Sequence, residues 1–292
     1  MRRIAAVIGL GLIGGSLALA LKKHTDFTVI GYDACRQTRQ LAEKSGELDG
    51  IADSLQTGVA EADIVFLAIP PGAIGQTVQQ AAGHLKAGAV VTDVASTKGE
   101  LLRIVPQLLP PGVCYVGGHP MAGSEKTGFI AANAQLFCGR PYIITRHQGV
   151  SESALAQLSA IAEQIGALPV VLEGEQHDPA VAHVSHTPYV TAAALTVLAG
   201  QGEQGQLHLA LAAGGFRDMT RIASSNPSLW ADICLTNKVE IKQTIARLKD
   251  ILDTVESKLA NGDRAGLTEF FQQAKQLRDA CQEQLTKGRV RQ

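Results

Sequence analysis

The 292-residue chain is poor in charge and has no paired cysteines. Only 18% of its residues are charged and its formal net charge is −1, which argues against a general nucleic-acid-binding surface. If a ligand is anionic, the cations that bind it must therefore be local. The five cysteines are scattered and form no CxxC pair, which indicates reduced thiols in a cytoplasmic protein.

A long, purely hydrophobic run is also missing. The uncharged stretch from Ile4 to Leu21 follows two arginines and so resembles a signal peptide or a membrane anchor. Clustered glycines interrupt it, and each weakens a helix by roughly 0.5–1 kcal/mol relative to alanine. We therefore expect a buried strand, a glycine turn and a buried helix here, and no membrane association.

The glycine turn has the form GxGxxG. Such a turn lets the backbone approach a pyrophosphate at a helix N-terminus. Asp33 ends a second apolar run, about 20 residues further on, where an acid that binds the ribose is expected. A carboxylate there favours NAD over NADP, although Arg36 nearby leaves a 2′-phosphate conceivable. The predicted cofactor is NAD, and the residues predicted to bind it are Gly9, Gly11, Leu12, Ile13, Gly14, Asp33, Pro70 and Ser96.

Strand-like and helix-like segments alternate over the first part of the chain. This alternation predicts an α/β, doubly wound (Rossmann) dinucleotide-binding domain over residues 1–172. From 173 to 292 the chain is rich in alanine and leucine and predicts an all-α domain with a partly apolar surface, which favours a homodimer. The expected later strands are 63–69, 89–94, 113–116, 142–145 and 169–172.

Three polar or proline-containing segments follow predicted strands. Ligands of such sheets bind beyond the carboxyl ends of the strands, so Pro70, Ser96 and His119 should face one crevice. His119 lies between paired glycines and a proline, and its imidazole can exchange a proton near neutral pH. The blander alternatives are that His119 bonds a loop carbonyl and that Ser96 caps a helix starting near Lys98.

In the helical part we expect one helix to open at Asp178-Pro179 and another to span Lys238 to Leu259. His183 and His186 are three residues apart, so on a regular helix they would share a face.

Five motifs in this order resemble the prephenate/arogenate dehydrogenases of tyrosine biosynthesis, and the resemblance covers nearly the whole chain. The first is common to many dehydrogenases and the other four are specific. They are Gly9 to Ser16, Asp93 to Lys98, Gly118 to Glu125, His183 to Pro188 and Gly214 to Ala223.

The resemblance implies that NAD takes hydride from C4 of a cyclohexadienol while its 4-hydroxyl loses a proton and its ring carboxylate leaves as CO₂. His119 matches the catalytic histidine and Ser96 a serine that shares its hydrogen bonds. The resemblance, with neighbouring residue types, gives these expected substrate-binding residues: Arg221, His186, Ser185, Ser124, Glu125, Arg217, His177 and Trp230.

Some alternatives remain open. Tyr189 stands where several relatives carry a histidine, which bears on the choice between prephenate and arogenate. The three histidines of the helical part would suit a metal, but the family uses none. A β-hydroxyacid dehydrogenase with Lys238 as its catalytic lysine is another enzyme candidate. A non-enzymatic dinucleotide sensor is the third, although the chain offers no basic recognition helix.

Overall fold

The computed structural model describes residues 2–124 and 126–290, with side chains up to Glu283. Its contacts divide the chain into two compact units, one ending at Lys238 and one beginning at Val239. The domain boundary expected between residues 172 and 173 remains a prediction.

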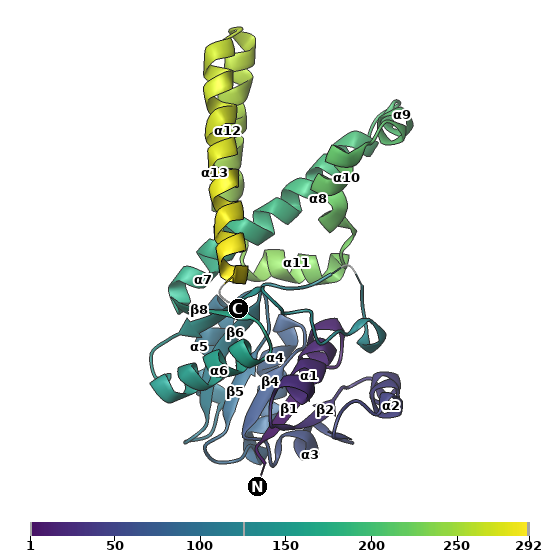
Figure 1. The fold of residues 1–292 in the computed structure, drawn as a ribbon, viewed down its shortest axis with the longest axis vertical. Coiled ribbons are helices and arrows are strands. Elements are labelled where there is room, and N and C mark those ends of the chain that lie inside the picture. The colour runs from purple at the N-terminus through teal and green to yellow at the C-terminus, as the bar shows by residue number, and fades with distance from the viewer. Residues whose placement is uncertain (1, 125, 291–292) are drawn as a thin grey trace. The chain divides into compact units, whose positions relative to one another are not determined.

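The first unit is built on an eight-stranded sheet in the order β3-β2-β1-β4-β5-β6-β7-β8 (Figure 1). All neighbouring strands are parallel except β6 and β7, which run antiparallel. The predicted α/β fold is confirmed, with the two-residue β3 as an unpredicted edge strand. The strands are β1 (Ile4–Ile8), β2 (Thr28–Tyr32), β3 (Gly50–Ile51), β4 (Ile64–Leu67), β5 (Val90–Asp93), β6 (Cys114–Pro120), β7 (Pro141–Arg146) and β8 (Leu168–Glu173).

Helices cover both faces of this sheet, because the central strands are apolar on both sides. Along β1, Ala5 and Val7 belong to one apolar cluster and Ala6 and Ile8 to the other. The first cluster is completed by α1 (Leu12–His24), α2 (Arg36–Ser45) and α6 (Glu152–Gln164). The second is completed by α3 (Leu55–Val59), α4 (Pro71–Ala81) and α5 (Gly99–Leu108). Short 3₁₀ turns lie at η1 (Ala82–His84) and η2 (Phe129–Ala131).

Strand β6 is longer than predicted, so His119 lies inside the strand and not beyond its end. The reason is β7, which pairs with the second half of β6 and places His119 opposite Ile143. An antiparallel partner can extend pairing past the point where the parallel neighbour β5 stops.

After β8 the chain is helical, but its first helix begins earlier than predicted. Helix α7 spans Gly174–Val181, so Asp178 and Pro179 lie inside it. A π-helical turn, η3 (Ala182–His186), follows. It leaves His183 exposed and His186 fully buried, so the expectation that they share a face was wrong. The wider turn changes the angular spacing on which that expectation depended.

The remaining helices of the first unit are α8 (Thr187–Gly200), α9 (Gly205–Ala210), α10 (Gly214–Thr220), the 3₁₀ turn η4 (Arg221–Ser224) and α11 (Pro227–Thr236). The second unit is a hairpin of two long helices, α12 (Lys238–Ala260) and α13 (Arg264–Val290). Helix α12 occupies almost the predicted range. Within the described residues, none of the helices is both long and apolar enough to cross a membrane.

Candidate active site

A chain of hydrogen bonds runs back from His119. Its Nδ1 lies 2.9 Å from Nε2 of His177, and Nδ1 of His177 lies 2.7 Å from Oδ1 of Asp178. Both imidazoles are buried. The strand β6 supplies the first histidine and the helix α7 supplies its two partners, so the predicted residues His119 and His177 are brought together.

The Asp178 carboxylate at the end of this chain determines which nitrogen of each histidine carries a proton. The Asp178 carboxylate accepts, so neutral His177 donates from Nδ1 and its Nε2 has a lone pair. That lone pair requires His119 to donate from Nδ1. Nε2 of His119 is then left without a proton, as a base needs.

The surroundings keep His119 neutral. Burial lowers the pKa of His119 well below its ordinary value of 6.5, and the charge of Lys98 adds to this effect. Burial also lowers the pKa of His177, although the Asp178 carboxylate opposes that shift. Burial would raise the pKa of Asp178, but hydrogen bonds from His177, Gly99 and Lys98 outweigh it and lower that pKa.

The Asp178 carboxylate also caps α5. Its two oxygens accept hydrogen bonds from the amides of Lys98 (2.8 Å) and Gly99 (2.9 Å). The alternative in which Ser96 caps this helix is therefore wrong. A carboxylate from another helix satisfies the amides instead, and Ser96 lies half-buried in the loop before them.

A buried ion pair supports this loop. Lys98 Nζ lies 2.7 Å from Oδ1 of Asp93 and 2.7 Å from the carbonyl of Ala95. The Tyr115 hydroxyl donates to Oδ2 of Asp93 at 2.6 Å. Burial lowers the pKa of Lys98 and Asp93 opposes that shift. Asp93 and Lys98 belong to one of the predicted motifs, but their pairing was not predictable because nothing local in the sequence indicates it.

His186 takes part in a second set of buried polar contacts. It is fully buried, and its Nδ1 is 3.1 Å from Nδ2 of Asn237. Burial lowers the pKa of His186 to about 4, while Asp178 and the main chain of Ser96 act in the opposite direction. Asn237 was not among the predicted site residues, because it belongs to none of the five motifs.

Two aromatic rings stand next to His186. The Trp230 ring lies edge-on to the imidazole at 6.0 Å and stacks on Tyr189 at 3.5 Å with an interplanar angle of 5°. Tyr189, which stands where several relatives carry a histidine, therefore packs its ring against Trp230.

The other predicted substrate residues lie at exposed or half-exposed positions. Arg217 is exposed on α10 and Arg221 is exposed at the start of η4, so the two arginines lie in different helical segments. Ser124 is exposed and accepts a hydrogen bond from the Lys126 amide at 3.2 Å. Ser185 is half-buried in η3, and Glu125 lies outside the described residues.

Within the described part of the chain, no hydrogen bond or ion pair joins Ser124, Ser185 or Arg217 to the histidines.

The turn between β1 and α1 has the shape that a nucleotide requires. A Cβ on Gly14 would lie 1.8 Å from the Gly9 carbonyl oxygen, so only glycine permits this packing. Gly9 has φ of 96°, which also favours glycine. A Cβ on Gly11 would meet nothing within 4 Å, so there is open space beside the backbone at the N-terminus of α1. This is an open, amide-lined approach for phosphate.

Asp33 stands beside the same turn. Its Oδ2 accepts from the Leu10 amide at 2.8 Å and its Oδ1 from the Cys35 amide at 2.8 Å. Pro70 is the N-cap residue of α4, beyond the end of β4. These residues fit the predicted dinucleotide site, with Asp33 held by main-chain amides next to the glycines.

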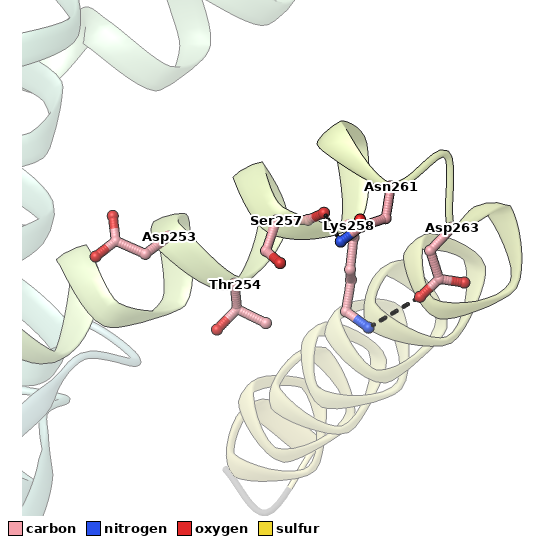
Figure 2. A pocket seen from close by; sticks show the side chains of 6 residues that line it. All are labelled: Asp253, Thr254, Ser257, Lys258, Asn261 and Asp263. Atoms are coloured by element: carbon pink, nitrogen blue, oxygen red, sulfur yellow. Dashed lines mark hydrogen bonds and ion pairs between the residues drawn. The ribbon is translucent and has the colours of Figure 1, made fainter.

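A polar hollow lies on the hairpin of the second unit (Figure 2). Its one lysine, Lys258, is 3.7 Å from Asp263, so its charge is already balanced. No histidine lines this hollow, and it offers none of the chemistry gathered around His119. Its lining residues are Asp253, Thr254, Ser257, Lys258, Asn261 and Asp263.

Two family models match the chain in succession. The model described as prephenate dehydrogenase, nucleotide-binding domain, matches residues 17–171, and the one described as prephenate dehydrogenase, dimerization domain, matches residues 173–273. A prephenate dehydrogenase of Bacillus subtilis (strain 168) is 38% identical over 285 residues, which cover 96% of this chain and 76% of the relative.

Solved structures are similar over the same extent. The arogenate dehydrogenase of Synechocystis is 31% identical with a TM-score of 0.82, over 96% of this chain and 99% of the other. The prephenate dehydrogenase of A. aeolicus, in complex with hydroxyphenyl propionate and NAD⁺, is 28% identical with a TM-score of 0.87, over 96% and 98%. The chain therefore belongs to the prephenate dehydrogenase family of oxidoreductases, as its motifs predict.

Proposed function

We propose that this protein catalyses the NAD-dependent oxidative decarboxylation of prephenate to 4-hydroxyphenylpyruvate, with His119 accepting the proton of the 4-hydroxyl. The hydrogen bonds from His119 to His177 (2.9 Å) and from His177 to Asp178 (2.7 Å) support this role most directly. They leave a buried, neutral imidazole with a free lone pair, and such a base contributes typically about 10²–10⁴-fold to a rate.

As the proton moves to Nε2, His119 becomes positively charged inside the protein. The Asp178 carboxylate, reached through His177, stabilises that charge at the moment it forms. Loss of CO₂ makes the ring aromatic and drives the reaction forward, so the protein mainly has to orient the substrate and take the proton.

For the cofactor, the residues Gly9, Gly11, Leu12, Ile13 and Gly14 would hold the pyrophosphate at the start of α1. Asp33 would accept hydrogen bonds from the ribose, which favours NAD⁺ over its 2′-phosphorylated form. Bound NAD⁺ supplies the hydride acceptor. Pro70 and Ser96, which follow neighbouring strands, would border the same site.

For the substrate, we assign carboxylate binding to Arg221, since a guanidinium binds both oxygens at once. His186, with Ser185 and Arg217, would contact the polar end of the molecule, and Trp230 would form an apolar wall. Ser124 would border the entrance to the substrate site, and the substrate-binding role expected of Glu125 falls on a residue outside the described ones. Ser96 would share a hydrogen bond with His119 and the substrate.

We also propose that the protein acts as a cytoplasmic homodimer formed through its C-terminal helices. The second family model is a dimerization domain, and the helical part exposes many large apolar side chains. Such surface is a frequent feature of subunit interfaces.

The test is a spectrophotometric assay with prephenate and arogenate, each with NAD⁺ and NADP⁺. We expect NADH from prephenate. Arogenate is the second candidate, because the similar Synechocystis structure is an arogenate dehydrogenase. Turnover of arogenate alone would replace the substrate assignment, and preference for NADP⁺ would overturn the role of Asp33. No turnover of either substrate would overturn the proposed function.

A further inference from the structure

We propose that Asn237 is a positioning residue that fixes His186 as a neutral hydrogen-bond donor, with its proton on Nε2 facing an oxygen acceptor of the substrate. The inference rests on the proposed function for the identity of that substrate. The tautomer itself follows from contacts inside the first unit and can be measured without substrate.

The orientation of the Asn237 amide is set by a main-chain carbonyl. Its Nδ2 lies 2.9 Å from the carbonyl oxygen of Asp178, which can only accept. The atom at that position must therefore be the nitrogen, and the amide cannot be flipped. Asn237 is 3% exposed, so water does not compete for this contact.

The second hydrogen of the same nitrogen points at His186. Nδ2 is 3.1 Å from Nδ1 of that imidazole. Since Nδ2 donates, Nδ1 must accept, and in the neutral ring the proton then sits on Nε2. The low pKa of His186, about 4, keeps the ring neutral at physiological pH.

Nε2 of His186 makes no hydrogen bond of ordinary geometry among the residues that the structure describes, although the side chain is fully buried and the main chain of Ser96 lies near the ring. A buried N–H without an acceptor is costly, so its place in a functional site calls for a ligand acceptor. A carboxylate or keto oxygen of the substrate is the acceptor that such a donor fits.

Asp178 thereby sets two histidines in opposite states. Its carboxylate makes Nε2 of His119 a base, and its carbonyl, through Asn237, makes Nε2 of His186 a donor. A substrate that loses a proton at one end and presents oxygens at the other needs one of each.

The experiment combines ¹⁵N-histidine NMR of the full-length protein without ligand with steady-state kinetics. In the wild type we expect His186, assigned by its loss in His186→Gln, to be the Nε2–H tautomer. In Asn237→Asp the carboxylate accepts from Nδ1, and we expect that tautomer to be lost. Asn237→Ala, which carries no new charge, should relax the tautomer to a mixture.

In the kinetics we expect Asn237→Asp to raise KM for prephenate at least about tenfold while kcat changes less than about threefold, because the side-chain hydrogen bonds that join His119, His177 and Asp178 do not include Asn237. In a His186→Gln background the same substitution should add little, since an amide has no tautomer to invert. The control is Asn226→Ala, which removes the N-cap at the other end of α11 and should leave both the His186 signal and KM unchanged.

A wild-type His186 protonated on Nδ1 would overturn the inference, as would an unchanged tautomer in both Asn237 variants. A fall in kcat as large as the rise in KM would assign Asn237 a merely structural role. If the wild type turns over neither cyclohexadienol, the proposed function fails while the NMR result still decides the tautomer.

Discussion

At the scale of single residues, the position of protons decides what each histidine can do. Asp178 is central because one side chain both caps α5 and accepts from His177. The same hydrogen bonds that lower the pKa of Asp178 keep its carboxylate ionised at neutral pH. His119 therefore always donates to His177, and His177 always donates to Asp178.

We expect Asp178→Asn to lower kcat by on the order of 10²–10⁴-fold. If the amide turns its nitrogen toward His177, each proton in the chain reverses and Nε2 of His119 carries a hydrogen. Steady-state NADH formation measures this effect. The matched control is Asp279→Asn, at an exposed pair with Lys275, and it should behave like the wild type. A kcat within about threefold of wild type would contradict the chain.

Acid should destabilise the protein through its buried histidines. The pKa values of His119, His177 and His186 are all lowered in the folded state, so the unfolded chain binds more protons as pH falls below about 6.5. Their contribution to the free energy of unfolding is fully present above that pH. It is lost as the pH falls toward the lowered pKa values of the folded state. For His186 alone, the change in pKa from 6.5 to about 4 corresponds to on the order of 3 kcal/mol in the free energy of unfolding.

Unfolding midpoints in urea between pH 7.5 and 5 test this expectation. The wild type should lose stability steadily below pH 6.5, and His186→Gln should show a shallower slope. His84→Asn, at an exposed histidine, should follow the wild type. A slope that is the same in all three proteins would show that His186 is not buried in its neutral form.

Residues in local motifs were predictable and residues joined from a distance were not. The segment around His119 contains the glycines, the proline and the histidine together, so its importance is visible in the sequence. Asn237 reaches His186 across 51 positions and Asp178 reaches Lys98 across 80. Ser96 was a reasonable cap by residue type, but a carboxylate on α7 took that place.

At the scale of elements, the two glycines of the β1–α1 turn serve different purposes: one permits close packing and the other leaves room for a ligand. A Cβ at position 14 would collide with the Gly9 carbonyl, whereas one at position 11 would enter open space. Both glycines belong to one motif, and only the structure tells their roles apart.

We therefore expect Gly11→Ala to weaken NAD⁺ binding by roughly tenfold or more, about 1.4 kcal/mol, while leaving the thermal unfolding midpoint nearly unchanged. Gly14→Ala should lower that midpoint, because α1 must move away from the turn. Isothermal titration and thermal melts give the two quantities. Normal NAD⁺ affinity in Gly11→Ala would show that the phosphates do not approach that position.

The π-turn η3 explains the main error about helical faces. A regular helix repeats every 3.6 residues, and the extra residue of a π-turn changes which side chains point inward. Pro188 lies just after this turn and has no amide hydrogen to offer the carbonyl four residues earlier, which favours the irregularity. The order of strands and helices was otherwise predictable because buried parallel strands are nearly continuous apolar runs.

At the scale of the whole molecule, the second unit exposes a large share of its apolar side chains. Leu252 on α12 and Phe271 on α13 are 57% and 60% exposed. Helical spacing predicted α12 but not which of its apolar residues would lack cover within one chain.

We expect Leu252→Glu with Phe271→Glu to reduce or abolish dimer formation, because charge at an apolar interface is left without a partner. Sedimentation at several concentrations measures the mass. The control pair, Asp250→Ala with Lys249→Ala, changes exposed polar residues of α12 and should leave the mass unchanged. A double glutamate variant that remains a dimer at low micromolar concentration would place the interface elsewhere.

In the proposed reaction, His119 takes the proton while NAD⁺ takes the hydride. The most direct measurement is NADH formation from prephenate by the wild type and by His119→Asn, with thermal melts to show that both are folded. We expect NADH from the wild type and a loss of at least about 10²-fold in the variant, at an unchanged melting midpoint. Near-normal turnover by folded His119→Asn would contradict it.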